Sequence, residues 1–324
     1  MSQVLRRWVL PWLAALPAAA WALVRLAGWD TRYPVAQLVT FTPYMTLGGM
    51  LPLLALLWWR RWAAACLAGL AVAVLAAVVL PRGLPDPDPL AGAAGPRLRV
   101  LTANVWRGSA VSGELVALVR EHRIDVLALQ EVSPEFLAEA DAAGLKELLP
   151  HRVDYSTPDA SGSAVLSRVP LRNNGVRINP GGWRQARAIL DMPDGGVVLV
   201  ESVHLQAPWV KAGTPLWAGG YGNQPPARPS GPARVLLGDF NSSLDHHLLR
   251  DLIGSGYRDA ADVTGHGLVG TWGPYGGDLI PPVALDRVLA EQRVGIADFR
   301  VLDLHGTDHL PVFAELVLPG QAPG

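Results

Sequence analysis

The chain has 324 residues, a formal net charge of −1 and a mean hydropathy of +0.23. Its single cysteine, Cys66, excludes an intrachain disulfide framework. The near-neutral charge argues against a strongly basic nucleic-acid-binding protein, and the length leaves room for a layered domain with its own core.

Nearly all the apolar excess lies before residue 82. Three stretches carry no charged side chain: 17 residues from Trp8 to Val24, 27 from Tyr33 to Trp59, and 20 from Trp62 to Pro81. A helix that crosses the hydrocarbon of a bilayer needs about 20 residues. We therefore predict a membrane region over 1–81 with three transmembrane helices at about 8–28, 35–59 and 62–81. A cleaved signal peptide is the alternative for the first stretch, and buried core helices are the alternative for the others.

Basic residues orient these helices, because short cytoplasmic segments retain Arg and Lys. Arg6 and Arg7 precede the first stretch, and Arg60 and Arg61 separate the second from the third. Both positions are expected on the cytoplasmic side. The third helix then leads outward through a Pro/Gly/Ala linker over 82–96. We predict a multi-pass protein of a bacterial cell membrane whose remaining domain is extracytoplasmic, and the excess of Arg over Lys suits a GC-rich bacterial genome.

Residues 97–319 form the second predicted domain, followed by a tail over 320–324. Between Arg97 and Leu318 there are 20 Lys and Arg against 25 Asp and Glu, the opposite of a surface that holds nucleic acid through its phosphates. Short apolar runs predict strands over 98–106, 125–132, 163–170, 186–192, 196–206, 234–241, 284–290 and 310–318. Apolar spacing of three and four predicts helices over 112–123, 134–149 and 244–256. The predicted fold class is α+β, with two packed β-sheets and helices outside them.

One stretch, 207–233, is rich in Pro and Gly and is predicted to be a long loop. It contains Trp209, Trp217 and Tyr221. Because aromatic side chains often lie at the depth of lipid headgroups, the loop is predicted to touch the outer leaflet. The alternative is that these aromatics pack on the domain's own surface.

Polar side chains stand at the ends of the predicted strands, where acids and amides can meet at one edge of a sandwich. They are Asn104, Glu131, His204, Asp239, Asn241, Asp286, Asp308 and His309. Converging carboxylates repel one another unless a cation lies between them. A hard divalent cation such as Mg²⁺ prefers oxygen ligands and retains waters that a phosphate can replace.

From Leu98 to Leu318 the chain resembles the endonuclease/exonuclease/phosphatase superfamily, which includes DNase I-like nucleases, sphingomyelinases and inositol-polyphosphate phosphatases. The resemblance is carried by seven motifs in the family's order: "TANVW", "LALQEV", "GSAVLSRVPL", "VHLQ", "GDFNSS", "LDRVL" and "GTDHLPVFAEL". It implies a DNase I-like four-layer α/β sandwich. It also implies a hydrolase of phosphoric ester bonds that depends on Mg²⁺ or Mn²⁺.

The resemblance also assigns a metal shell and a base. It makes Glu131 the principal metal ligand, with Asn104 and Asp308 completing or supporting the shell. His309 is the basic residue aligned with the attacking water, and Asp286 orients it. The structural alternatives are a helix entry near Glu131 and a loop with an N-capping Asp308.

Further roles follow from the same resemblance. Asp239 and Asn241 position the water and hold the pentavalent phosphorus, while His204 donates a hydrogen bond to a phosphate oxygen. A plain turn at "GDFN" and a satisfied core histidine at 204 are the alternatives. Arg168 and Arg187 are candidate phosphate contacts, although surface ion pairs explain such arginines equally well.

The setting narrows the function. Three apolar stretches, a Pro-rich linker and "GTW…LDRVL…GTDHLPV" resemble the bacterial membrane-anchored branch that includes teicoplanin-resistance proteins. This implies hydrolysis of an undecaprenyl-type lipid diphosphate or another phospholipid outside the cell, with a link to glycopeptide resistance. The expected partners are the lipid substrate and the bilayer, with no protein partner predicted. The alternatives are a surface-tethered Mg²⁺-dependent nuclease and a catalytically silent binding domain.

Overall fold

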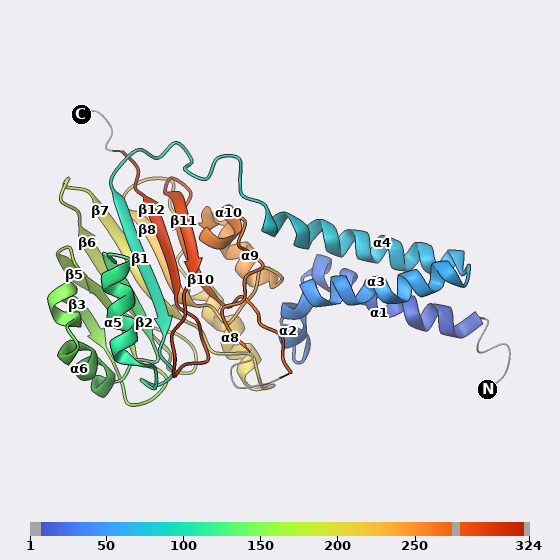
Figure 1. Ribbon diagram of the computed structural model, residues 1–324, viewed down its shortest axis with the longest axis horizontal. Helices are drawn as coiled ribbons and strands as arrows, with labels where there is room; N and C mark the ends of the chain where they lie inside the picture. Colours follow the sequence, from blue (N-terminus) through green and yellow to red (C-terminus); the bar gives the residue numbers. More distant parts are fainter. Residues whose placement is uncertain (1–7, 274–278, 321–324) are drawn as a thin grey trace.

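The computed structural model describes residues 8–273 and 279–320. A bundle of apolar helices stands at one end of the molecule and a two-sheet sandwich at the other (Figure 1). Arg6 and Arg7, which contributed to the predicted orientation, lie outside the described residues. The predicted tail beyond Gly320 lies outside them as well.

The helix bundle is formed by residues 10–83. Its elements are α1 (Leu10–Ala27), α2 (Val35–Leu38), the 3₁₀ turn η2 (Val39–Phe41), α3 (Thr42–Trp58), α4 (Trp62–Val79) and the 3₁₀ turn η3 (Leu80–Gly83). Three helical segments, 10–27, 35–58 and 62–83, are long and apolar enough to cross a membrane. Small side chains let α1 and α4 pack closely, among them Ala15, Ala18, Ala64 and Ala68. Large apolar side chains such as Leu51 and Leu70 point outward, which is stable in hydrocarbon and unfavourable in water.

Two six-stranded sheets form the sandwich. The first has the order β11-β12-β1-β2-β4-β3 and the second β5-β6-β7-β8-β10-β9. The pairs β1–β2 and β7–β8 are parallel, so both sheets are mixed. The strands of the first sheet are β1 (Arg97–Asn104), β2 (Val126–Gln130), β3 (His151–Tyr155), β4 (Ser163–Ser167), β11 (Gly295–Val301) and β12 (Val312–Val317). Those of the second are β5 (Leu171–Ile178), β6 (Arg184–Asp191), β7 (Val197–His204), β8 (Ala233–Asp239), β9 (Tyr257–Asp259) and β10 (Asp286–Glu291).

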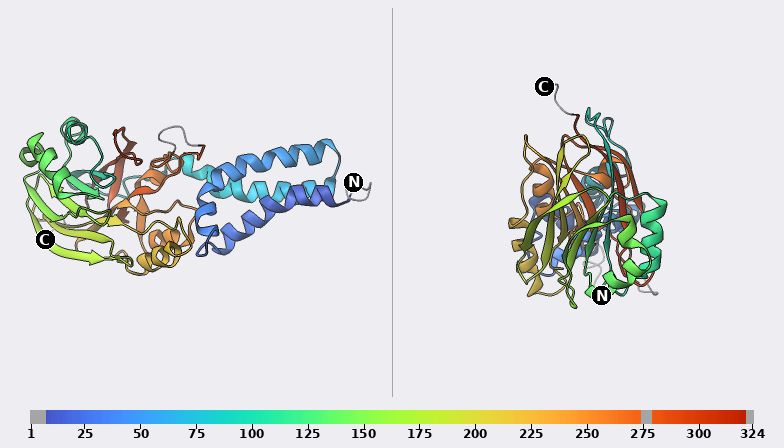
Figure 2. Two further views of the ribbon diagram at one scale, coloured as in Figure 1. Left: turned by 90° about the horizontal axis from the view of Figure 1, so that it is seen from below. Right: turned by 90° about the vertical axis from the view of Figure 1, so that its left-hand side faces the viewer.

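Helices complete the four layers (Figure 2). Three of them, α5 (Ser112–Glu121), α6 (Pro134–Ala142) and α7 (Leu145–Leu148), cover the first sheet, while α8 (Gly213–Gly222) and α9 (His247–Gly254) cover the second. A short α10 (Ala260–Val263) follows β9. Because both faces of each sheet are buried, the central strands are almost continuously apolar.

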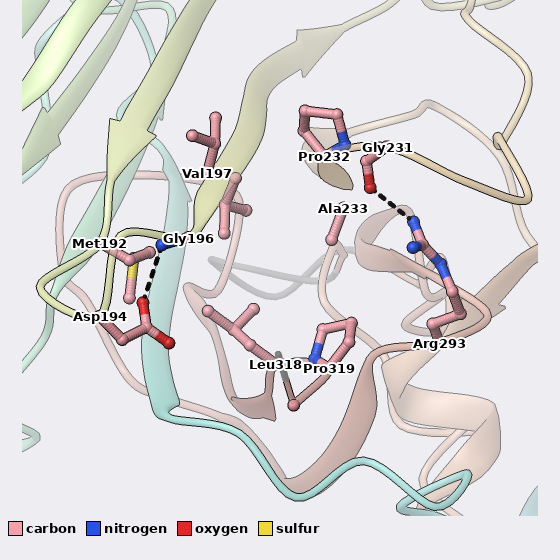
Figure 3. Close-up of a pocket in the computed structure, with 12 residues that line it drawn as sticks. Met192, Asp194, Gly196, Val197, Gly231, Pro232, Ala233, Arg293, Leu318 and Pro319 are labelled. Carbon is pink, nitrogen blue, oxygen red and sulfur yellow. Dashed lines mark hydrogen bonds between the residues drawn. The ribbon is translucent and has the colours of Figure 1, made fainter. Parts of the chain in front are cut away.

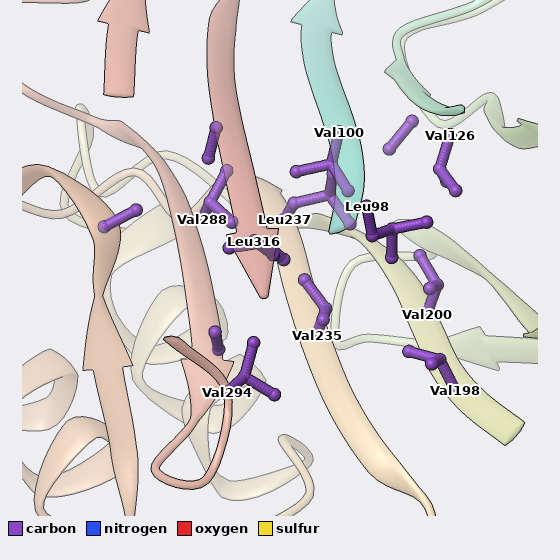
Figure 4. Packing of buried hydrophobic residues seen from close by; sticks show 14 of the residues in the cluster. Leu98, Val100, Val126, Val198, Val200, Val235, Leu237, Val288, Val294 and Leu316 are labelled. Carbon is purple, nitrogen blue, oxygen red and sulfur yellow. The ribbon is translucent and has the colours of Figure 1, made fainter. Parts of the chain in front are cut away.

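The main core lies between the sheets (Figure 4). Leu98 and Val100 of β1 point into it, whereas Leu101 and Ala103 point to the helices on the other face. Val235 and Leu237 of β8 meet them from the opposite sheet. The prediction of two packed sheets flanked by helices is therefore confirmed.

The structure corrects the prediction for 207–233. This stretch contains α8, so it is not a structureless loop. The side chain of Trp217 is fully buried and its Nε1 donates to Ser242 Oγ at 3.0 Å, while the Tyr221 hydroxyl donates to Phe240 O at 3.3 Å. Two of the three aromatics thus pack on the domain itself, and Trp209 remains 68% exposed.

The bundle is docked on the sandwich through buried polar contacts. Asp245 accepts hydrogen bonds from Arg25 Nε at 2.9 Å and from both terminal nitrogens of Arg82 at 2.8 and 2.6 Å. Asp30, in the turn after α1, accepts from the His247 backbone N–H at 2.8 Å, at the first residue of α9. These contacts join residues 163 to 220 positions apart and set where the bundle meets the domain.

Candidate active site

Strand pairing brings the predicted polar residues to one edge of the sandwich. Asn104 lies opposite Gln130 at the ends of the parallel strands β1 and β2. In the second sheet His204 pairs with Asp239, which also lies opposite Asp286 on antiparallel β10. The two sheets therefore deliver side chains from five strands to the same place.

The backbone at this edge takes conformations that most residues avoid. Glu131 and Asn241 have φ angles of +53° and +48°. Such left-handed geometry in residues other than glycine is costly and concentrates at functional sites. Gly238 has φ +147°, and a Cβ there would lie 2.0 Å from Val203 O, so the approach of β8 to β7 beside the site requires glycine.

The side-chain amide of Asn104 lies against two acids of the site, Glu131 and Asp239. Asn104 Nδ2 lies 3.2 Å from both Glu131 Oε1 and Asp239 Oδ2. His204 Nε2 faces the same two carboxylates at 3.8 and 3.7 Å. Asn241 closes the group, because its backbone N–H donates to Asp239 Oδ1 at 2.8 Å and its Nδ2 to Leu205 O at 2.8 Å.

An imidazole and a second acid complete the site. His309 Nδ1 hydrogen-bonds to Asp286 Oδ2 at 2.8 Å, and its Nε2 lies 3.6 Å from Asp239 Oδ2. Asp286 Oδ2 also accepts from the Thr271 hydroxyl at 2.7 Å, and Asp308 Oδ2 accepts from Trp272 Nε1 at 3.1 Å. Thr271 and Trp272 were not assigned a role from the sequence. The "GTW" motif was their signal, and their contribution is to hold the two acids.

Burial dominates the electrostatics of the site. It raises the pKa of Glu131 above its usual range and that of Asp239 to about 6. It lowers the pKa of His204 to about 4, so that this imidazole is neutral near pH 7. Burial alone would lower the pKa of His309, but the neighbouring charges of Asp286 and Asp239 raise it to about 10. The cluster thus carries crowded negative charge that only a proton or another cation can offset.

The residues present fit a divalent cation. Glu131 and Asp308 offer carboxylate oxygens, the ligands that hard cations prefer. Asn104 supports Glu131 through its Nδ2, while its Oδ1 accepts from the Trp106 backbone N–H at 3.0 Å. Asp239, Asp286 and His309 also bring three potential ligand atoms within 4.8 Å of one another. The donor chemistry accordingly matches the expected metal, whereas the choice between Mg²⁺ and Mn²⁺ stays a prediction.

A cavity of about 840 Å³ opens at this site. Glu131, His204, Asp239, Asn241, Asp308 and His309 line its polar side. Four tryptophans line it as well, namely Trp106, Trp183, Trp209 and Trp272. Trp183 packs edge-on against His204 with ring centroids 4.4 Å apart and fixes that imidazole. The helix bundle supplies part of the remaining wall, at Ala36, Gln37, Thr40 and Phe41.

Six of the eight polar residues predicted from the motifs therefore line one cavity, and Asn104 and Asp286 are hydrogen-bonded to members of that group, although the individual catalytic roles stay predictions. The two arginines do not join them. Arg168 follows β4 at the end remote from Ser163, which pairs with Gln130 at the site, and donates to Ile124 O at 3.1 Å. Arg187 lies beside Glu201 in mid-strand, with Nε 4.0 Å from the carboxylate. Neither arginine lines the cavity, because β-strand register carries each away from the edge, and a phosphate contact by either stays a prediction.

Arg287, inside the "LDRVL" motif, stabilises the structure beside the site. Its side chain is buried, bound to Asp259 at 2.7 Å, and its Nε donates to Ser242 O at 3.1 Å. It thereby ties the "GDFNSS" turn to β9 and stabilises the loop that carries Asp239.

Residues 101–309 match the model of the endonuclease/exonuclease/phosphatase family. The chain belongs to this family, whose members hydrolyse phosphoester bonds.

Solved structures share the fold at low sequence identity. An endonuclease/exonuclease/phosphatase from Beutenbergia cavernae superposes with a TM-score of 0.53 at 20% identity, covering 69% of this chain and 72% of its own. A mannosyl-6-phosphatase from Bacteroides thetaiotaomicron gives 0.52 at 16%, covering 68% and 100%. Truncated TDP2 from Caenorhabditis elegans gives 0.53 at 17%, covering 68% and 98%. A comparison with curated proteins gave no match. These likenesses confirm the DNase I-like fold.

Proposed function

We propose that this protein is a membrane-anchored, metal-dependent phosphoesterase with an extracytoplasmic catalytic domain. Its substrate is a phosphate ester or diphosphate carried by a membrane lipid, of the undecaprenyl-diphosphate or phospholipid type. One observation carries the proposal: the acids and histidines share their cavity with the bundle residues Ala36 to Phe41. A site walled by a membrane-type helix is suited to a substrate that resides in the membrane.

Exposed aromatic side chains support this reading of the setting. Trp58 and Trp59 are 85% and 67% exposed at the end of the bundle far from the sandwich. Trp29 and Tyr33 are 62% and 47% exposed at the near end. Aromatic residues are enriched at both membrane–water interfaces. Two such belts, with apolar surface between them, would put the cavity at the depth of one leaflet's headgroups.

The orientation follows from the described basic residues. Arg60 and Arg61 lie in the turn between α3 and α4, at the end of the bundle opposite the sandwich (Figure 1). Cytoplasmic turns retain arginine. With this turn inside the cell, the catalytic domain lies outside it.

The chemistry proposed is in-line attack of water on phosphorus. A water held by Asp239 Oδ2 and His309 Nε2 would pass its proton to Asp239, since the raised pKa of His309 keeps that imidazole protonated near pH 7. The water oxygen bonds to phosphorus as the bond to the leaving oxygen breaks on the opposite side. Asp286 fixes the ring of His309, and the side-chain N–H groups of Asn104 and His204 face the growing negative charge. A divalent cation held by Glu131 and Asp308, with Asn104 supporting Glu131 by its hydrogen bond, would supply Lewis-acid stabilisation of the phosphoryl oxygens when bound.

The test is a substrate panel for the detergent-purified protein. Phosphate release is measured from undecaprenyl diphosphate, phosphatidic acid, a phosphodiester lipid and DNA, beside Asp239→Ala and His309→Ala. Arg168→Ala serves as a control, because Arg168 lies away from the site. We expect release from a lipid substrate and a loss of at least about 10²-fold in the two site variants.

Each other result has a definite meaning. Faster cleavage of DNA than of any lipid supports the nuclease alternative. No product from any substrate supports a silent binding domain, and variants that match the parent refute the catalytic site. A link to glycopeptide resistance is tested by expression in a susceptible bacterium, where the parent but not Asp239→Ala should raise tolerance.

A further inference from the structure

The cavity has two chemically different ends. One end holds the acids and imidazoles of the sandwich, and the other is formed by Ala36, Gln37, Thr40 and Phe41 together with Pro208 and Trp209. Trp209, which lines this end, is 68% exposed, and the next residue, Val210, is 39% exposed. The segment 33–59, which forms the bundle side of this end, carries no charged side chain.

The bundle side of this cavity is held in place by hydrogen bonds. The backbone N–H of Ser243 donates to His246 Nδ1 at 3.0 Å, so the proton of this imidazole lies on Nε2, which donates to Ala36 O at 2.6 Å. Gln37 Nε2 donates to Trp209 O, and the Tyr44 hydroxyl donates to Pro282 O at 2.6 Å. Three separate loops of the sandwich thus hold the segment from α2 to the start of α3 by hydrogen bonds. This wall of the cavity is therefore fixed in position relative to the site.

One polar atom in the wall has no partner. The hydroxyl oxygen of Thr40 is buried and makes no hydrogen bond to any described residue. Since Thr40 lines the cavity, this hydroxyl can bond to an oxygen of an occupant near the boundary between its polar and apolar ends.

A second cavity shows by contrast what is specific to the first. It measures about 290 Å³ and lies at the opposite end of the sandwich, between the ends of β7 and β8 and the segment after β12 (Figure 3). Its arginine, Arg293, is already bound to Glu291 and to Gly231 O. Its lining contains no described residue of the bundle.

We propose that a tail-binding groove receives the first part of a single apolar chain, isoprenyl or acyl, attached to the phosphate at the catalytic end. The groove is formed by Ala36, Gln37, Thr40, Phe41, Ala207, Pro208 and Trp209. The rest of the chain stays in the bilayer. Specificity for lipid is then determined by the membrane region, because the sandwich alone supplies only the phosphate end. This inference rests on the proposed phosphoesterase function.

The test keeps the reacting group constant and varies the chain. Dimethylallyl, farnesyl and undecaprenyl diphosphates carry the same headgroup, and phosphatidic acid provides the acyl arm. The variants are Phe41→Ser, which truncates the groove, and Leu38→Ser, which removes an exposed apolar side chain of the same helical segment outside the cavity. The kcat/KM ratio of farnesyl over dimethylallyl diphosphate should fall about tenfold or more in Phe41→Ser, as loss of a buried aromatic contact implies, and should equal the parent's in Leu38→Ser.

A second readout needs no turnover. A diazirine-tagged farnesyl phosphate is crosslinked to the full chain in phosphatidylcholine vesicles, in the His309→Ala background, and the labelled residues are identified by mass spectrometry. We expect label within 35–41 or 207–209. Label confined to other segments, or an unchanged farnesyl preference in Phe41→Ser, would overturn the groove. If the parent hydrolyses nothing in the panel, the proposed function fails, and the crosslink still decides whether the groove binds a chain.

Discussion

Asp245 is the strongest point of attachment between the bundle and the catalytic domain, and replacing it with asparagine tests that attachment. Its carboxylate is completely buried and accepts three hydrogen bonds, one from Arg25 and two from Arg82. Both guanidinium groups are almost buried, with side-chain exposures of 8% and 6%. Asp245→Asn changes no volume but removes the only charge that lies against both arginines among the described ion pairs.

The expected magnitude follows from these contacts. Asparagine keeps one acceptor oxygen, and its amide group points donors at donors, so at least one charge-assisted bond is lost. Removing one partner of a buried ion pair typically costs about 3–5 kcal/mol, because the remaining charge is left uncompensated. Since about 1.4 kcal/mol is a factor of ten, the ratio of docked to undocked domain should fall by roughly 10²–10³-fold.

Two measurements check this in detergent micelles. Hydrogen exchange should accelerate in α9, whose first backbone N–H is bound to Asp30 of the bundle. Proteolysis of the linker 84–96 should become faster than in the parent. Asp141→Asn is the matched control, because Asp141 binds Arg152 with the same bidentate geometry at 23–27% exposure and should cost less than about 1 kcal/mol.

The pKa of Asp245 determines how pH affects the difference in docking stability between the parent and Asp245→Asn. Burial alone would raise the pKa of Asp245, but the hydrogen bond and charge of Arg82, followed by those of Arg25, hold it below its usual range. A depressed pKa stabilises the docked state above the unfolded value of about 4 and loses that stabilisation only as the pH falls further. The gap between parent and variant should therefore be equal at about pH 6 and about pH 8. If hydrogen exchange in α9 and proteolysis of the linker are the same in Asp245→Asn as in the parent, the buried ion pairs of Asp245 do not hold the bundle on the domain.

Three further predictions concern the catalytic domain. Glu131→Gln should need at least about tenfold more Mg²⁺ or Mn²⁺ for half-maximal activity after chelation, measured by metal titration, since a ligand charge is lost. Gly238→Ala should destabilise the domain by more than about 3 kcal/mol in thermal unfolding, because the new methyl lies 2.0 Å from Val203 O. Trp217→Ala should cost about 3–5 kcal/mol by the same measurement, because it empties a fully buried site under α8.

The strands found from the sequence and those missed differ in position. The eight predicted strands include every central strand of both sheets, where two buried faces give continuous apolar runs. The four missed strands, β3, β5, β9 and β11, are the four sheet edges. An edge strand is paired on one side only, and its sequence is mixed: β5 contains Asn-Asn-Gly, and the pairings of β5 and β11 are both interrupted by a bulge. Polar residues and bulges are common in edge strands, where they prevent pairing with other chains. They also interrupt the regular spacing of apolar residues from which the strands were predicted.

The helix α8 was missed for a different reason. Four of its ten residues are glycine, which lowers intrinsic helix propensity. The glycines permit close packing, since a Cβ at Gly220 would lie 3.0 Å from the Leu205 side chain and one at Gly219 3.2 Å from Pro180. Tertiary contacts of Trp217 therefore override the local preference. The contacts between bundle and sandwich were likewise beyond prediction, because they join single residues far apart in the chain.

The site itself was more predictable than the surfaces around it. Asn104, His204, Asp239 and Asp286 are terminal residues of strands whose register is fixed by apolar burial, and Glu131 and Asn241 follow two such strands within two residues. Topology therefore brings these six together, while Asp308 and His309 reach the site from the segment before β12. Arg168 and Arg187 had no such constraint, and the strand register placed both away from the site.

The loop after β8 links the candidate active site to the helix bundle. It follows Asp239, the last residue of β8, carries Asn241 at the polar end of the cavity, and reaches Asp245 six residues after Asp239. On one side Ser242 is held by Trp217 and Arg287, and on the other His246 donates to Ala36 O. A shift of the bundle must therefore either break these hydrogen bonds or move the loop that carries Asp239. The same short segment consequently sets the distance between Asp239 and the wall proposed to receive the lipid chain. Loss of the Asp245 hydrogen bonds to the bundle should therefore impair hydrolysis of long-chain substrates before it impairs that of short ones.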